Sequence, residues 1–208
     1  MKIAVLGATG RTGHYLVEEL MRRGHDLTVL VRSPARLGPL AERVTVVEGS
    51  STDSDALDRA VAGADAVVSA LGPAGKQPRL HRETAAALIP TMQRHGIRRY
   101  VGVSGAGIDV PGDRKGIPDR LISGLVRRFG GEMANDKVIE YGLFAASDLD
   151  WTLVRPPRLR DGEPSGATHH DATRPGKTWV RRADLSAFLA DVVEQGSYVR
   201  QAPFVSTA

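Results

Sequence analysis

The sequence contains no cysteine, few aromatic residues and no long apolar run. Because none of its 208 residues is cysteine, disulfides, thiolate metal sites, iron–sulfur clusters and cysteine nucleophiles are excluded. Aromatic residues make up only 5%, which argues against a stacking platform for nucleic acid. No apolar run approaches the roughly 20 residues that span a bilayer, and Gly7 interrupts the first run too early for a signal peptide. We therefore expect a cytoplasmic protein that binds neither a membrane nor nucleic acid.

Basic residues slightly outnumber acidic ones, since 28 Lys and Arg against 24 Asp and Glu give a net charge of +4. They are scattered along the chain, unlike the clusters that are typical of nucleic-acid binding. A basic surface also suits a phosphate-bearing cofactor. The length predicts one domain over residues 1–208, because domains commonly have about 100–200 residues.

Short apolar runs alternate with helical patterns along the chain. The apolar runs predict strands at residues 2–6, 27–31, 44–48, 66–70, 100–104, 151–155, 178–180 and 202–206. Helical spacing predicts helices at residues 11–23, 53–61, 79–95, 135–146 and 184–193. The alternation predicts an α/β fold with one doubly wound parallel sheet, covered by helices on both faces. We expect segments 105–134 and 158–208 to cover the substrate, with an irregular polar loop at 158–177.

A glycine-rich motif connects the first expected strand to the first expected helix. The first glycine of such a motif permits a tight turn, the second lets backbone N–H groups approach a pyrophosphate, and the third allows close packing. The free N–H groups and the dipole of the helix N-terminus favour the anion. The motif predicts a Rossmann-type fold in which a dinucleotide binds Gly7, Thr9, Gly10, Arg11, Thr12 and Gly13.

The end of the second expected strand indicates which dinucleotide binds. In NAD-selective folds an Asp or Glu about 20 residues after the glycine motif binds the ribose 2′-hydroxyl. Here Arg32 takes that position, and Ser33 and Arg36 follow it. A guanidinium forms bidentate bonds to phosphate, so these three residues predict NADP(H) in preference to NAD(H). The alternative is that both arginines are solvated surface charges.

Two further loops follow expected strands at the edge where ligands of open α/β sheets bind. Ser50 and Ser51 are candidates for contact with the adenine ring. Ala70, Leu71 and Gly72 are candidates for contact with the ribose and pyrophosphate. By position alone, each loop could equally be an ordinary turn.

Six segments carry a resemblance to a known family. They are KIAVLGATGRTG at 2–13, TVLVRSPAR at 28–36, VAGADAVVSAL at 61–71, YVGVS at 100–104, LDWTLVRPPRL at 149–159 and RADLSAF at 182–188. With these segments the chain resembles, over nearly its whole length, the atypical short-chain dehydrogenase/reductases, in the NmrA-like and flavin reductase (biliverdin-IX-beta reductase-like) branch. The resemblance implies a Rossmann-type fold and NAD(P)H binding. It leaves the substrate open, because the family includes flavin and quinone reductases, sugar epimerases and redox-sensing regulators.

The Tyr-x-x-x-Lys pair of the family's usual dehydrogenases is missing. No lysine stands four residues after any of the tyrosines, which are Tyr15, Tyr100, Tyr141 and Tyr198. Lys137 stands four residues before Tyr141, which places both on one helix face. The resemblance implies catalytic roles for Lys137 and for Ser104, which ends the fifth expected strand. The alternatives are a solvated helix lysine at Lys137 and a hydroxyl at Ser104 that only caps the next loop. Ser104 is followed by Gly105 where some relatives have a second serine, so the register of the serine role is open.

The remaining candidates follow the sixth expected strand. The resemblance implies that the backbone of Pro156 and Pro157 wraps around the nicotinamide, and that Ser104 and Lys137 also contact the cofactor. Arg158 is a candidate ligand for an anionic substrate, or an ordinary surface arginine. Adjacent His169 and His170 lack a third ligand at matching spacing, so we expect no metal.

The missing tyrosine also bears on the substrate. Flavins and quinones accept hydride without a strongly activated acid, whereas a plain ketone needs a proton donor at the developing alkoxide. We therefore expect an NADPH-dependent oxidoreductase that reduces a flavin-, quinone- or enone-like small molecule, as a monomer or homodimer. The alternatives are an NADP(H)-sensing NmrA-like regulator or accessory protein without turnover, and an epimerase or isomerase that uses bound cofactor.

Overall fold

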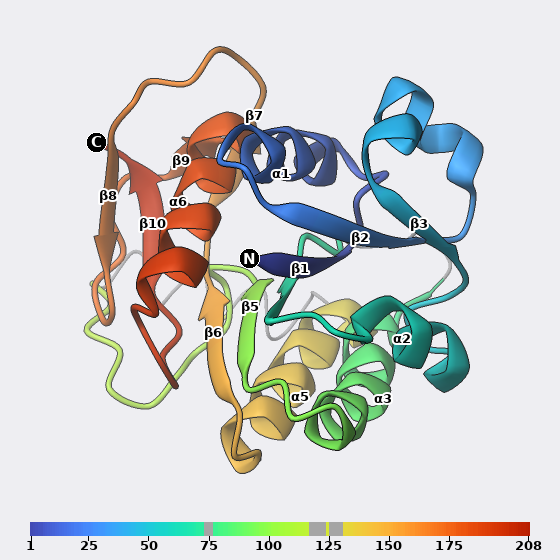
Figure 1. The fold of residues 1–208 in the computed structure, drawn as a ribbon. Helices are drawn as coiled ribbons and strands as arrows, with labels where there is room; N and C mark the ends of the chain where they lie inside the picture. Colours follow the sequence, from blue (N-terminus) through green and yellow to red (C-terminus); the bar gives the residue numbers. More distant parts are fainter. Residues whose placement is uncertain (73–76, 117–123, 125–130) are drawn as a thin grey trace.

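A six-stranded parallel sheet forms the centre of the protein, with the strand order β3-β2-β1-β4-β5-β6 (Figure 1). The computed structural model describes residues 1–72, 77–116, 124 and 131–208. The strands of this sheet are β1 Lys2–Leu6, β2 Asp26–Val31, β3 Thr45–Glu48, β4 Ala66–Ser69, β5 Arg99–Val103 and β6 Asp150–Val154. The order reverses between β1 and β4, and such a switch point is where open α/β sheets bind ligands. The predicted Rossmann-type architecture is confirmed.

Helices cover both faces of the sheet, as the nearly continuous apolar strands predict. Figure 1 shows α1 and α6 on one face and α2, α3 and α5 on the other. The helices are α1 Arg11–Arg22, α2 Ser54–Val61, α3 Leu80–Arg94, α5 Gly131–Ala146 and α6 Arg182–Gln195. Alternate residues of β1 enter two different cores, with Ile3 facing α1 and α6 and Leu6 facing α2 and α3. None of the helices in the described ranges is long and apolar enough to cross a membrane.

Local signals in the sequence explain where two helices begin. Asp53 caps α2, because its carboxylate accepts hydrogen bonds from the backbone N–H groups of Asp55 at 3.0 Å and Ala56 at 3.4 Å. α1 begins directly after Gly10, and no side chain caps it. Its last turn ends at the expected glycine, since Gly24 has a φ of 81°. Between β2 and β3 the chain forms a 3₁₀ segment at Pro34–Arg43.

The C-terminal part is more regular than the sequence predicts. Residues 158–177, expected to be an irregular loop, contain two short strands, β7 Arg158–Arg160 and β8 Thr168–Asp171. β7 pairs with β9 Trp179–Arg181, and β8 pairs with β10 Phe204–Thr207. That prediction was wrong because these strands are short and polar, and their pairing partners lie far along the chain. Much of the expected covering segment 105–134 lies outside the described residues.

Candidate active site

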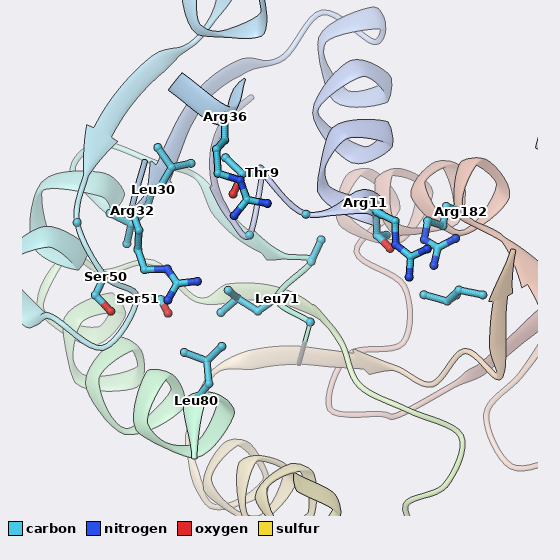
Figure 2. A pocket seen from close by; sticks show the side chains of 18 residues that line it. Thr9, Arg11, Leu30, Arg32, Arg36, Ser50, Ser51, Leu71, Leu80 and Arg182 are labelled. Carbon is cyan, nitrogen blue, oxygen red and sulfur yellow. The ribbon is translucent and has the colours of Figure 1, made fainter. Parts of the chain in front are cut away.

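A pocket of about 380 Å³ lies where the carboxyl ends of β1 to β4 meet. Figure 2 shows it bounded by the glycine motif, the end of β2, the loop after β3 and the loop after β4. Many of the predicted cofactor residues line this pocket, and they come from all four loops. These are Gly7, Thr9, Gly10, Arg11, Thr12, Arg32, Arg36, Ser50, Ser51, Ala70, Leu71 and Gly72.

The glycine motif forms a turn that larger residues would block. Gly7 has a φ of 79°, and a Cβ there would lie 2.7 Å from the backbone nitrogen of Leu71. A Cβ on Gly13 would collide with the carbonyl oxygen of Gly7 and with the backbone of Ala8. Gly13 does not line the pocket, so its part in the site is to let α1 pack tightly against the turn. The turn is closed by a hydrogen bond from the Gly10 N–H to the Gly7 carbonyl at 3.0 Å.

The N-terminus of α1 opens into this pocket. Neither a side-chain cap nor an acidic residue in the first turn is present at this end of the helix. Its first N–H groups are therefore left for another partner, and the helix dipole favours an anion there. Arg11 and Thr12, the first two residues of the helix, both line the pocket. This geometry suits a phosphate group.

The charge of the pocket wall is all of one sign. Arg11, Arg32, Arg36 and Arg182 line it, and among the described residues of the wall no side chain is acidic. Arg32 donates a hydrogen bond of 3.0 Å to the side-chain oxygen of Gln77, a neutral partner. The predicted Ser33 does not line the pocket and instead precedes the 3₁₀ segment.

Several wall residues were missed by the sequence reasoning. Leu30, Val31 and Leu80 supply apolar surface to the wall. Figure 2 shows Leu30 and Leu80 on the same side of the pocket as Ser50 and Ser51, which suits a flat ring. Leu159 and Arg182 reach the pocket from the C-terminal part. Arg182 begins the quoted segment RADLSAF, but nothing in its spacing indicates contact with a loop more than 160 residues earlier. The contact of these residues with the pocket could be found only from the tertiary structure.

The other predicted residues do not line the pocket. Ser104 follows β5, and its hydroxyl is buried without a hydrogen-bond partner among the described residues. The carbonyl of Pro156 accepts a hydrogen bond of 3.0 Å from the Ala106 N–H, so Pro156 helps to hold the loop that follows Ser104. Arg158 is exposed at the start of β7. An unpaired buried hydroxyl is costly, which is compatible with Ser104 contacting a ligand.

Lys137 belongs to a buried cluster between α3, α5 and β5. Its Nζ lies 2.9 Å from Nδ1 of His81, 2.9 Å from the carbonyl oxygen of Val103 and 3.0 Å from Oε2 of Glu140. An ammonium group only donates, so Nδ1 of His81 accepts and its imidazole is neutral. Burial, and then the charge of Lys137, lower the pKa of His81 from 6.5 to about 3. All three ammonium protons of Lys137 therefore have acceptors within the protein.

Glu140 is the acidic member of this cluster. Its side chain is 5% exposed. Burial raises its pKa, and Lys137 partly opposes that rise. The cluster holds the lysine directly behind the strand end that carries Ser104, because Val103 precedes that serine. The cluster can therefore orient the end of β5 and hold the charge of Lys137 next to it.

Comparison with known proteins identifies the fold and its ligand class. A family model described as NAD(P)H-binding matches residues 7–196. A crystal structure of a protein from Burkholderia pseudomallei is 31% identical, covers 99% of both chains and has a TM-score of 0.78. ChuY, an anaerobillin reductase from Escherichia coli O157:H7, has a TM-score of 0.83 over 100% of this chain and 97% of its own, at 20% identity. The likeness to ChuY, at 20% identity, shows the fold alone.

A curated relative at similar identity is a named reductase. The (4-alkanoyl-5-oxo-2,5-dihydrofuran-3-yl)methyl phosphate reductase of Streptomyces griseus is 30% identical over 154 residues, covering 74% of this chain and 46% of its own length. The chain spans 25% to 48% of the length of the first curated relatives that it matches. The family-model match over residues 7–196 includes the glycine motif and all the residues that line the pocket.

Proposed function

The chain belongs to the NAD(P)H-binding family, and we propose that it is an NADPH-dependent reductase of a flavin-, quinone- or enone-like small molecule. The observation that carries the proposal is the pocket itself. A glycine turn and an uncapped helix N-terminus lie along a wall with four arginines and, in the described part of the chain, no acidic side chain.

Preference for NADPH over NADH follows from the end of β2. Arg32 stands where NAD-selective folds place a carboxylate for the ribose 2′-hydroxyl, and Arg36 lines the pocket beside it. A guanidinium there attracts the 2′-phosphate of NADPH and offers nothing comparable to an unphosphorylated ribose. Arg32 donates a hydrogen bond to the side-chain amide of Gln77. Because that amide is neutral, it does not compensate the positive charge of Arg32.

The acceptor class follows from what surrounds the expected nicotinamide end. When bound, the nicotinamide supplies the hydride. We place Ser104 there, with a buried hydroxyl that has no hydrogen-bond partner among the described residues. The three ammonium protons of Lys137 are taken up by His81, Val103 and Glu140. Neither arrangement is the tyrosine acid of a ketone reductase, so acceptors that need little proton donation fit best. The reductase names of relatives support the reaction class.

Titration of the purified protein with NADPH and with NADH is the direct test, followed by NADPH oxidation with FMN, riboflavin and a simple quinone. Hydrogen bonds to charged groups contribute about 1.5–3 kcal/mol. We therefore expect Arg32→Ala to weaken NADPH binding by about 10- to 150-fold and to leave NADH binding nearly unchanged. Arg43→Ala, at the far end of the 3₁₀ segment and exposed, is the matched control. Equal affinity of the wild type for both nucleotides would refute the NADPH preference, and no NADPH oxidation with any acceptor would refute the reductase.

A second candidate is a protein that binds NADP(H) without turnover. The observation in its favour is the complete use of the Lys137 protons inside the protein. It predicts tight NADPH binding with no oxidation by any of the three acceptors. An isomerase would instead retain cofactor through purification with no net oxidation. The proposal further places the protein in the cytoplasm as a monomer or homodimer.

A further inference from the structure

The short β7–β9 pair carries a group of side chains that the proposed function does not use. Its parallel register defines what we call the β7–β9 face, which consists of Arg158, Arg160, Trp179 and Arg181. Successive side chains of a strand point to opposite sides. The residues between them point inward, because Leu159 lines the pocket and Val180 is fully buried. The β7–β9 face is therefore turned away from the pocket, and a molecule bound there would not meet the nicotinamide.

An indole ring holds two of the guanidiniums in place on this face. Cζ of Arg160 lies 4.7 Å from the ring centroid of Trp179, and Cζ of Arg181 lies 5.6 Å from it. The negative face of the ring attracts both cations. Trp179 and Arg181 are partly exposed and Arg160 is exposed, so all three are open to solvent. A stacked guanidinium loses little freedom when it forms hydrogen bonds, which prepares the face for an anionic partner.

The positive charge of this face is not neutralised within the part of the chain that the structure describes. Arg160 stands opposite Arg181 in the register, and like charges on neighbouring strands repel. Asp161 follows Arg160 directly, but its carboxylate accepts from Arg182 at 2.7 Å and lies 4.0 Å from Arg11. Across the described ranges, none of the three arginines of the face forms an ion pair with a carboxylate. A bound carboxylate would relieve the repulsion between them.

We propose that the β7–β9 face docks an extended acidic segment of another protein, in which Asp or Glu stands at alternate positions. Arg158 and Arg160 lie two residues apart on one strand, so their side chains repeat at about 6.6 Å. Alternate side chains of an extended peptide repeat at the same distance. Each carboxylate can then meet one guanidinium in the bidentate geometry that arginine favours.

The dimensions of the face favour an acidic peptide over a nucleic acid. Sites for single-stranded nucleic acid combine a basic groove with several stacking rings. Here the face is built on two strands of three residues each and carries a single indole, in a chain with 5% aromatic residues. The proposal does not rest on the proposed reductase activity, since the face lies apart from the pocket.

The probe is a labelled six-residue peptide in which glutamate alternates with serine, titrated into the full chain and followed by fluorescence anisotropy. We expect it to bind at least about tenfold more tightly than the same peptide with glutamine in place of glutamate. Arg160→Gln and Arg181→Gln should each weaken it by about three- to tenfold. Higher salt should weaken it further, because the face is exposed.

Two substitutions serve as matched controls for the position of the lost charge. Arg43→Gln removes an exposed arginine outside the face, and Arg32→Gln removes one from the pocket wall. Neither should change the affinity for the peptide. Arg160→Gln and Arg181→Gln alter side chains that are open to solvent, so their Tm should stay within about 2 °C of the wild type. Weaker binding then reports on the face and not on unfolding.

Intrinsic fluorescence locates the peptide independently. The chain has two tryptophans, and Trp151 is only 3% exposed. Peptide binding should therefore change the emission of Trp179, and the change should be absent in Trp179→Phe.

Four results would overturn the proposal. The first is equal binding of the glutamate and glutamine peptides, and the second is an affinity that Arg160→Gln and Arg181→Gln leave unchanged. The third is an equal loss in Arg43→Gln or Arg32→Gln, which would indicate nonspecific attraction or binding in the pocket. The fourth is tighter binding, through the same two arginines, of an oligodeoxythymidine with equal charge, which would assign the face to nucleic acid.

Discussion

Replacing Lys137 with methionine should show that its cluster is a buried ion pair on which the fold depends. The substitution keeps an unbranched side chain and removes the ammonium group. Glu140, 5% exposed, is then left as a buried carboxylate without its ion-pair partner. Breaking a buried pair in this way costs about 3–5 kcal/mol. For a domain of this size each kcal/mol lowers Tm by about 2–4 °C, so we expect a fall of about 6–20 °C.

The loss should depend on pH in a defined direction. Burial raises the pKa of Glu140 above its usual 4.5, and the Lys137 charge restrains that rise. In Lys137→Met the pKa rises further, so the folded state keeps a proton that the unfolded chain releases. Because the folded state then binds more protons, the free energy of unfolding falls as pH increases above about 4.5. The destabilisation should be larger at pH 8 than at pH 5.

Urea denaturation of four proteins tests this reasoning, namely the wild type, Lys137→Met, Glu140→Gln and the double variant. The double variant has no charge in the cluster, so it should recover most of the stability lost at pH 8. Lys2→Met, an exposed lysine, is the control for the substitution itself. Equal stability of Lys137→Met and the wild type at pH 8, or no recovery in the double variant, would refute the buried ion pair. A folded double variant that binds NADPH but has lost turnover, while Glu140→Gln keeps it, would in addition show that Lys137 acts in catalysis.

Three further predictions concern positions where the structure fixes the outcome. Gly13→Ala forces a Cβ into backbone atoms and should weaken NADPH binding at least tenfold by titration, whereas Gly142→Ala, in open space on α5, should bind normally. His81 has a pKa of about 3 in the folded protein, against 6.5 in the unfolded chain. The free energy of unfolding should therefore fall by at most about 5 kcal/mol as the pH drops from about 6.5 to about 3. His81→Gln should flatten that part of the pH–stability curve, and an unchanged curve would contradict the assignment. Asp113 binds the fully buried Arg155 through two 2.7 Å contacts, and Asp113→Asn should lower the free energy of unfolding by about 3 kcal/mol in urea.

The central sheet could be predicted from the sequence because its strands, apart from the edge strand β3, are mostly buried. Such strands appear as apolar runs, and the glycine turn marks where the first one ends. β7 and β8 could not be predicted, because their polar residues carry no periodic signal. β7 is stabilised by pairing with β9 and β8 by pairing with β10, and both partners are distant in the sequence from the strands they pair with.

The same contrast divides the site. Residues of the glycine motif and of the strand ends could be predicted because a parallel sheet brings the carboxyl ends of its strands to one edge. Arg182 and Leu159 could not, since their contact with the pocket depends on how the C-terminal part folds back. His81 was missed for a related reason. Its partner Lys137 lies 56 residues away on another helix, and only their packing places the two nitrogens 2.9 Å apart.

The positions of the four pocket arginines argue for a long ligand with charge at more than one point. Arg32 and Arg36 lie on the side of β2, and Arg11 and Arg182 lie at the opposite end, beyond Leu71 (Figure 2). A small neutral molecule would leave Arg11 and Arg182 with only the exposed Asp161 as an anionic partner, and would add no negative charge beside Arg32 and Arg36. A dinucleotide with a 2′-phosphate and a central diphosphate can meet both pairs at once. On this reasoning the pocket wall has no acidic side chain among its described residues because the ligand itself supplies the negative charge.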